Sequence, residues 1–167
     1  EVWGRLALRL ANAEVHAYDL RQYATTVRGF LDALAGVPGA AGELDLTAAV
    51  TAVAAWQSEA EALQKKIDAA LASGEAPPAS SLSALNAALL RVERELLVAD
   101  GIPGRPWFKH GLYAPRYTYA AMSLPGVREA AEAGNWTEAR RQLEVLTGRL
   151  RAATEATRRA ASEVPGP

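Results

Sequence analysis

Residues 101–126 constrain the fold more than any other stretch of this 167-residue chain. They read GIPGRPWFKHGLYAPRYTYAAMSLPG and contain four of the nine prolines, at positions 103, 106, 115 and 125. Because proline fixes φ and lacks a backbone donor, we expect neither a regular helix nor a strand across this stretch. Its aromatic content argues against disorder. A long loop of this kind inside a compact domain is usually functional.

The sequence on both sides of this loop is rich in Ala and Leu and predicts helices. Apolar residues recur at three- and four-residue spacing in a short segment over residues 2–11 and in four longer segments. The longer segments begin near Asp19, near Asp45, near one of Ser80, Ser81 and Ser83, and near Asn135, and these side chains can cap a helix. The predicted fold class is therefore all-α. We expect a four-helix antiparallel bundle, with the aromatic, proline-rich loop and a short extra helix over 125–133 between the third and fourth main helices.

Charge and composition exclude several classes of function. With 18 basic and 19 acidic residues, the chain has no electrostatic footprint for nucleic acid or an anionic membrane. It has no cysteine, so disulfides and thiolate metal sites are excluded. No apolar run approaches the roughly 20 residues of a membrane span. The chain lacks an initiating Met and a signal peptide, so we expect it to be a fragment of a longer protein.

Candidate chemical groups are few. The only histidines are His16 and His110, whereas a hydrolytic zinc site needs about three protein ligands. We therefore predict no catalytic residue, no metal ligand and no cofactor in this chain, and a structural hydrogen bond for His110. The tyrosines at 113, 117 and 119 could bind a ligand or pack the loop onto the helices, and the residues leave both readings open. Trp3 and Trp56 lie beside the apolar stripes of their helices. We expect one or both to contact a partner chain or a missing domain, unless they widen the core.

Several motifs together resemble one known family. They are the run RPWFKHGLYAP at 105–115, SLPG at 123–126, LAN at 10–12, YDLRQYA at 18–24 and the final helix from Trp136. They are similar to the C-terminal helical domain of the glutamate carboxypeptidase II and transferrin receptor family. The resemblance covers essentially the whole chain. It implies that residues 1–167 form a transferrin-receptor-like dimerisation domain.

The resemblance also implies partners and an activity for the parent protein. In that family this domain forms a homodimer and follows a peptidase domain that carries two zinc ions. The zinc ligands and the general base lie upstream of this chain. The resemblance thus implies that this chain alone is not an enzyme, while its parent is a zinc-dependent peptidase, with zinc in the missing upstream domain. An extracytoplasmic or secreted location is suggested by the resemblance alone.

The family's helical domain also lends a loop to the substrate pocket. In glutamate-preferring members, a Lys-Tyr pair in this loop recognises the substrate. Here the resemblance places the tyrosine at Tyr119 and puts Thr118 where the lysine stands. Tyr113 matches the tyrosine at the start of the loop, and Arg116 could supply the missing charge. Two alternatives stay open: a receptor-like relative without catalysis, and a free-standing helical interaction domain.

Overall fold

The computed structural model describes residues 1–72, 77–116 and 121–165, and these residues are mostly helical. Within them the chain forms seven helices and one antiparallel sheet of two strands. The elements are, in order, α1 (Val2–Ala11), α2 (Leu20–Ala35), α3 (Ala40–Glu43), α4 (Thr47–Ala72), α5 (Ala79–Arg94), β1 (Tyr113–Pro115), β2 (Ala121–Ser123), α6 (Pro125–Glu132) and α7 (Trp136–Ser162).

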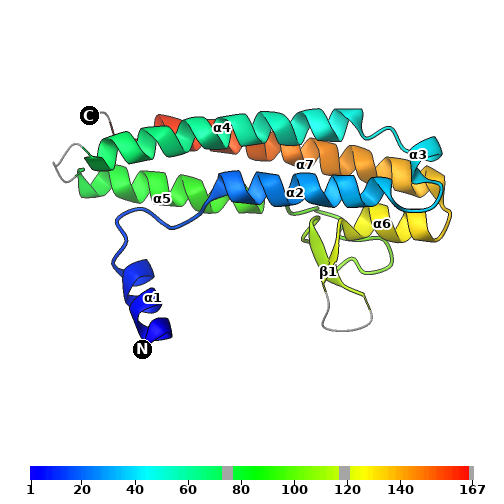
Figure 1. Ribbon diagram of the computed structural model, residues 1–167, viewed down its shortest axis with the longest axis horizontal. Helices are drawn as coiled ribbons and strands as arrows, with labels where there is room; N and C mark the ends of the chain where they lie inside the picture. Colours follow the sequence, from blue (N-terminus) through cyan, green and yellow to red (C-terminus); the bar gives the residue numbers. More distant parts are fainter. Residues whose placement is uncertain (73–76, 117–120, 166–167) are drawn as a thin grey trace.

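Four helices lie alongside one another and give the molecule its elongated shape (Figure 1). The two longest, α4 and α7, run in the same direction, and α2 and α5 run in the opposite direction (Figure 1). α2 packs against α4, and α5 packs against α7. Both α2 and α5 have 16 residues, whereas α4 has 26 and α7 has 27. Each shorter helix therefore covers only part of the length of the α4–α7 pair.

The core is built around α7, against which α4, α5 and α6 all pack. Small side chains on the facing surfaces of α4 and α7 let the two helix axes approach closely. The buried alanines are at 49, 52, 60 and 70 on α4 and at 139, 153, 156, 160 and 161 on α7. Among the described residues, no helix is both long enough and apolar enough to cross a bilayer.

Trp56 is fully buried in this core. Its indole nitrogen donates a hydrogen bond to Thr157 Oγ1 on α7 at 3.0 Å, and its ring lies 5.4 Å from that of Tyr23 on α2. The expectation that it contacts a partner or a missing domain is wrong. Because α2 and α7 both cover α4, the buried face of α4 is wider than the single stripe visible in the sequence.

Two of the main helices, α2 and α7, begin at the predicted caps. The Asp19 carboxylate accepts hydrogen bonds from the backbone of Arg21 and Gln22, and the Asn135 side chain accepts one from Glu138 N. These bonds satisfy backbone donors that the first turn leaves free. The prediction that Ser80, Ser81 or Ser83 caps α5 is wrong, since that helix begins at Ala79 after Pro78 and all three serines lie inside it. The four-residue helix α3 had no predicted counterpart.

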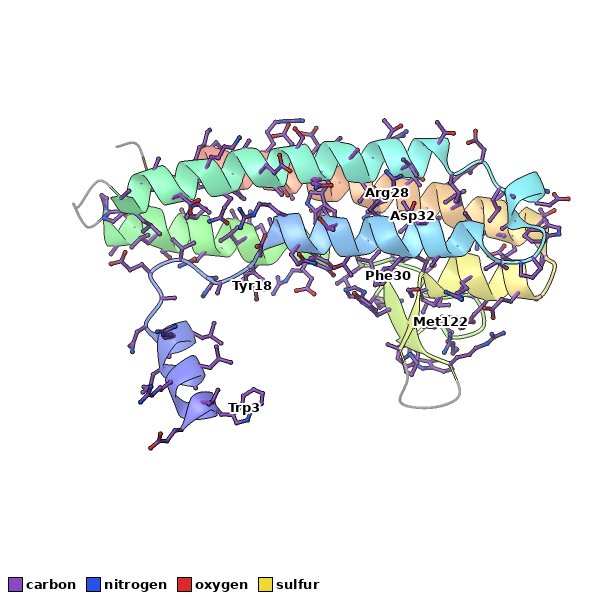
Figure 2. The ribbon with its side chains drawn as sticks, viewed as in Figure 1. Trp3, Tyr18, Arg28, Phe30, Asp32 and Met122 are labelled. Carbon is purple, nitrogen blue, oxygen red and sulfur yellow. The ribbon has the colours of Figure 1, made fainter. Side chains whose placement is uncertain are left out.

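α1 stands away from the other helices (Figure 1). None of its residues is buried, and Trp3, at the end of the helix farther from the bundle, is 82% exposed and projects sideways from the helix (Figure 2). The connection to α2 is nevertheless held in place. The Asn86 side chain of α5 accepts a hydrogen bond from His16 N at 2.8 Å and donates one to Glu14 O at 2.9 Å. The point at which α1 leaves the bundle is thus fixed by a side chain of α5.

Candidate functional site

The segment between α5 and β1 is folded by turns and backbone hydrogen bonds. Val98 N donates to Lys109 O at 2.8 Å, which pairs the two ends of the segment. Gly101 has a φ of 70° and lies so close to the chain opposite that an added Cβ would be 2.4 Å from Pro106 O. Only glycine fits such a position without strain. The segment therefore forms a compact base from which β1 starts.

A short hairpin extends from this base on one side of the helices (Figure 1). It pairs Tyr113 of β1 with Ser123 of β2, and Pro115 with Ala121. The prediction that residues 101–126 contain no strand is wrong, and the fold is not strictly all-α. A proline is tolerated here because each strand of a two-stranded sheet has a free edge. The Tyr113 ring meets Phe30 of α2 edge-on at 5.3 Å, which attaches the hairpin to the helices.

Arg105 joins the base, the hairpin and α6. Its guanidinium donates to Pro115 O at the end of β1 and to the Glu129 carboxylate on α6. It also lies over the Phe108 ring, with Cζ 5.4 Å from the centroid. The Arg105 and Glu129 side chains are only 17% and 21% exposed, so solvent screens the pair less than it screens a surface pair. Arg105 thus acts as an anchor for the hairpin.

Arg116, the residue after β1, is held on α6. Its guanidinium pairs with one carboxylate oxygen of Glu132, and Arg128 Nε bonds the other oxygen at 3.0 Å. Partial burial acts to raise the pKa of Glu132, but hydrogen bonds from Arg128 and Arg116 outweigh it and hold the pKa below its usual value. Glu132 is therefore ionised at neutral pH and shared between two arginines.

His110 supports the start of the hairpin. Its Nδ1 accepts a hydrogen bond from Leu112 N at 3.3 Å, and its ring lies 5.8 Å from that of Tyr113. Burial lowers the pKa of His110, against the opposing effect of Glu93, whose carboxylate is 3.8 Å from Nε2. The imidazole is thus neutral at neutral pH, with Nδ1 as acceptor. This confirms the predicted structural hydrogen bond.

The structure describes two of the four predicted pocket residues. Tyr113 begins β1 at the base of the hairpin, where burial raises the pKa of its hydroxyl, and Arg116 follows the other end of that strand. Thr118 and Tyr119 fall outside the described residues. Sequence reasoning did not find Arg105 or Glu132 as anchors. Their contacts span 10 to 24 residues across irregular backbone, a separation at which no periodic pattern exists to reveal them.

The side chains that the structure describes in the hairpin and its base define what this site can contact. Within residues 1–72, 77–116 and 121–165, no group of three or more His, Asp or Glu side chains is placed to hold a metal ion. The site combines aromatic rings, a half-buried neutral histidine and arginines in ion pairs. Such groups can contact a ligand or a neighbouring domain.

Comparison with known families identifies the domain. The profile of the transferrin receptor-like dimerisation domain matches residues 44–158, more than half of the chain. The chain belongs to this family. The match begins just before α4 and ends near the end of α7, so it includes the hairpin, its base and α6. It confirms the resemblance seen in the motifs around residues 105–126.

Known relatives of the dimerisation domain are much longer than this chain. A maize protein named probable glutamate carboxypeptidase VP8 is 32% identical over 78% of the chain and 18% of its own length. A protein of the fungus Arthroderma benhamiae, named probable glutamate carboxypeptidase, is 29% identical over 84% of the chain and 20% of its own length. A Schizosaccharomyces pombe protein named inactive zinc metalloprotease C354.09c is 26% identical over 86% of the chain and 19% of its own length. The chain thus spans about a fifth of the length of these relatives.

Proposed function

We propose that residues 1–167 are the dimerisation and substrate-pocket-lining domain of a zinc-dependent exopeptidase that resembles glutamate carboxypeptidase. The zinc ions and the catalytic groups belong to the upstream domain of the parent protein. The antiparallel arrangement of α2, α4, α5 and α7 serves as a rigid support for the hairpin. The partners are a second copy of the chain and the parent's own peptidase domain.

One observation carries the proposal that the hairpin faces another domain. α1 and the hairpin project from the same side of the bundle and are separated along its length (Figure 1). The apolar residues of α1 are exposed, with Val2 at 78% and Leu8 at 63%. An apolar helix surface of this kind indicates a partner. A domain that covers α1 from this side would also reach the hairpin.

Self-association is the first expected property. We expect the 167-residue chain to form dimers whose fraction rises with concentration, because a dimerisation domain keeps its apolar contact surface when isolated. Sedimentation velocity across a concentration series measures this. Trp3→Ser is the companion variant: a weaker dimer would place α1 at the subunit interface, and an unchanged dimer would leave α1 to the peptidase domain. A chain that stays monomeric at high concentration would contradict the dimerisation proposal.

Substrate contact by the hairpin is the second expected property. We expect Tyr119→Phe in the full-length parent to lower kcat/KM by about tenfold or less, because it removes one neutral hydrogen bond. We expect Thr118→Lys to shift preference toward acidic substrates, since it adds a charged partner. The measurement is kcat/KM for peptides ending in Glu, Leu and Ala. If Tyr119→Phe and Arg116→Ala leave every rate and ratio unchanged, the loop is structural packing only.

A parent without catalysis is the second candidate. It is supported by the relative named inactive zinc metalloprotease C354.09c, to which 86% of this chain is similar. The same domain would then serve a binding protein. Zinc content of the full-length parent after dialysis separates the two candidates, since an intact peptidase retains its zinc and a receptor-like relative does not.

A further inference from the structure

A groove of about 350 Å³ lies where the start of α4 meets α7. Its uncharged lining consists of Ala48, Leu143 and Thr147, and its charged lining consists of Asp45, Arg140, Glu144 and Arg151. The groove therefore offers a small apolar floor between acidic and basic side chains. α4 lies on the side of the bundle away from α1 and the hairpin (Figure 1). A domain that covers α1 and the hairpin would leave this groove open to another partner.

Two of the charged groups have no partner in the part of the chain that the structure describes. Glu144 and Arg151 are exposed, and there neither takes part in an ion pair or a side-chain hydrogen bond. They are about two helical turns apart on α7, which is too far for them to pair with each other. By contrast, Arg140, Arg141 and Arg158 of the same helix each pair with an acidic side chain of the chain itself.

The charges on this face of α7 are arranged with opposite signs about its middle. Glu144 and Arg151 lie equally far in sequence from a point between residues 147 and 148. Arg140 and Glu155 are also equally far from that point and again have opposite charges. All four side chains leave α7 within about 60° of one another around the helix axis. If a second α7 crosses this one in the antiparallel direction about a two-fold axis at that point, each acidic side chain faces a basic one.

We propose that this face of α7 is the surface on which a second copy of the chain docks, with Glu144 of each copy paired with Arg151 of the other. This inference rests on the proposed dimerisation function and assigns a face to it. Gly148 lies beside the two-fold axis, and a Cβ added there would meet no atom within 4 Å. The absence of a side chain at this open position lets two helices approach closely. Because a two-fold axis repeats every contact, each dimer contains two Glu144–Arg151 pairs.

Charge reversal in the 167-residue chain tests the pairing, with the dissociation constant of the dimer measured by sedimentation velocity. We expect Glu144→Arg and Arg151→Glu each to raise this constant about tenfold, because two attractive pairs become two repulsive ones. The double variant Glu144→Arg with Arg151→Glu should regain the wild-type constant. An equimolar mixture of the two single variants should also regain it by forming heterodimers, since two arginines of one chain then face two glutamates of the other.

Arg91→Glu is the matched control, because it changes the net charge as Arg151→Glu does. Arg91 is exposed on α5 and has no ion-pair partner within residues 1–72, 77–116 and 121–165. We expect an unchanged dissociation constant for this variant, and an effect as large as that of Arg151→Glu would overturn the proposal, since net charge alone would then control association.

Two further outcomes separate this inference from the dimerisation function. If the wild-type chain dimerises but Glu144→Arg and Arg151→Glu leave the constant unchanged, the dimerisation function stands and the α7 face is wrong. The α7 pairing is also wrong if both variants dimerise weakly and neither their mixture nor the double variant recovers, because the losses would then not arise from Glu144 and Arg151 facing each other. A wild-type chain that stays monomeric at high concentration contradicts both proposals.

Discussion

Gly101→Ala should destabilise the chain by about 3 kcal/mol, through two separate effects. The φ of 70° at this residue costs an L-amino acid about 1 to 2 kcal/mol. The new methyl would also lie 2.4 Å from Pro106 O and 2.8 Å from Phe108 O. Both atoms belong to the backbone and cannot rotate away, so overpacking should add about 1 to 3 kcal/mol. Urea unfolding of the 167-residue chain measures the change in the free energy of unfolding.

Gly104→Ala separates the two effects. Gly104 belongs to the same segment and has a φ of 77°, but an added Cβ there would meet no atom within 4 Å. We expect it to cost only about 1 kcal/mol, since the strain of the positive φ is partly offset by the lower entropy of the unfolded chain. Equal losses for the two variants would show that Gly101 does not approach the opposite backbone as closely as the structure has it.

The contrast between these glycines illustrates what sequence could predict at the site. Prolines and glycines located the irregular segment correctly, because each restricts or frees the backbone locally. They did not reveal that Gly101 contacts the backbone of residues 106–108, or that Arg105 reaches α6. Those contacts depend on the path of the whole loop. The hairpin was missed for a related reason, since strands of three residues are too short to show alternation and one of them contains Pro115.

The helices were predicted more completely. Their apolar stripes and the caps at Asp19 and Asn135 are local features that tertiary structure left unchanged. The burial of Trp56 was not predicted. A prediction from an apolar stripe assumes that each helix packs on one face only, whereas α4 is covered by both α2 and α7. The sequence thus indicated which residues are helical but not how wide each buried face is.

Thr157→Val should destabilise the chain by about 2 kcal/mol. The Thr157 hydroxyl accepts the hydrogen bond of Trp56 Nε1 at 3.0 Å and donates to Ala153 O at 2.8 Å. Both Trp56 and Thr157 are fully buried. Valine keeps the shape of threonine but leaves the indole N–H without a partner in the core, which costs about 1 to 3 kcal/mol. Urea unfolding followed by tryptophan fluorescence measures the loss.

Thr154→Val is the control for the loss of the hydroxyl itself. Thr154 is buried on the same helix, and its hydroxyl donates to Leu150 O at 2.9 Å, the bond equivalent to that from Thr157 to Ala153. We expect a change of about 0.5 kcal/mol or less, since the Leu150 carbonyl keeps its bond within the helix and threonine bonds of this kind stabilise a helix little.

A double-mutant cycle then isolates the bond between α4 and α7. In a Trp56→Phe background the indole N–H is absent, so Thr157→Val leaves no donor unsatisfied. We expect it to cost no more there than Thr154→Val does in the wild-type chain. The difference between the two backgrounds, about 1.5 kcal/mol, is the coupling energy of the Trp56–Thr157 pair. If Thr157→Val costs the same in both backgrounds, the hydroxyl stabilises α7 alone, and packing of apolar surface holds α4 and α7 together without this bond.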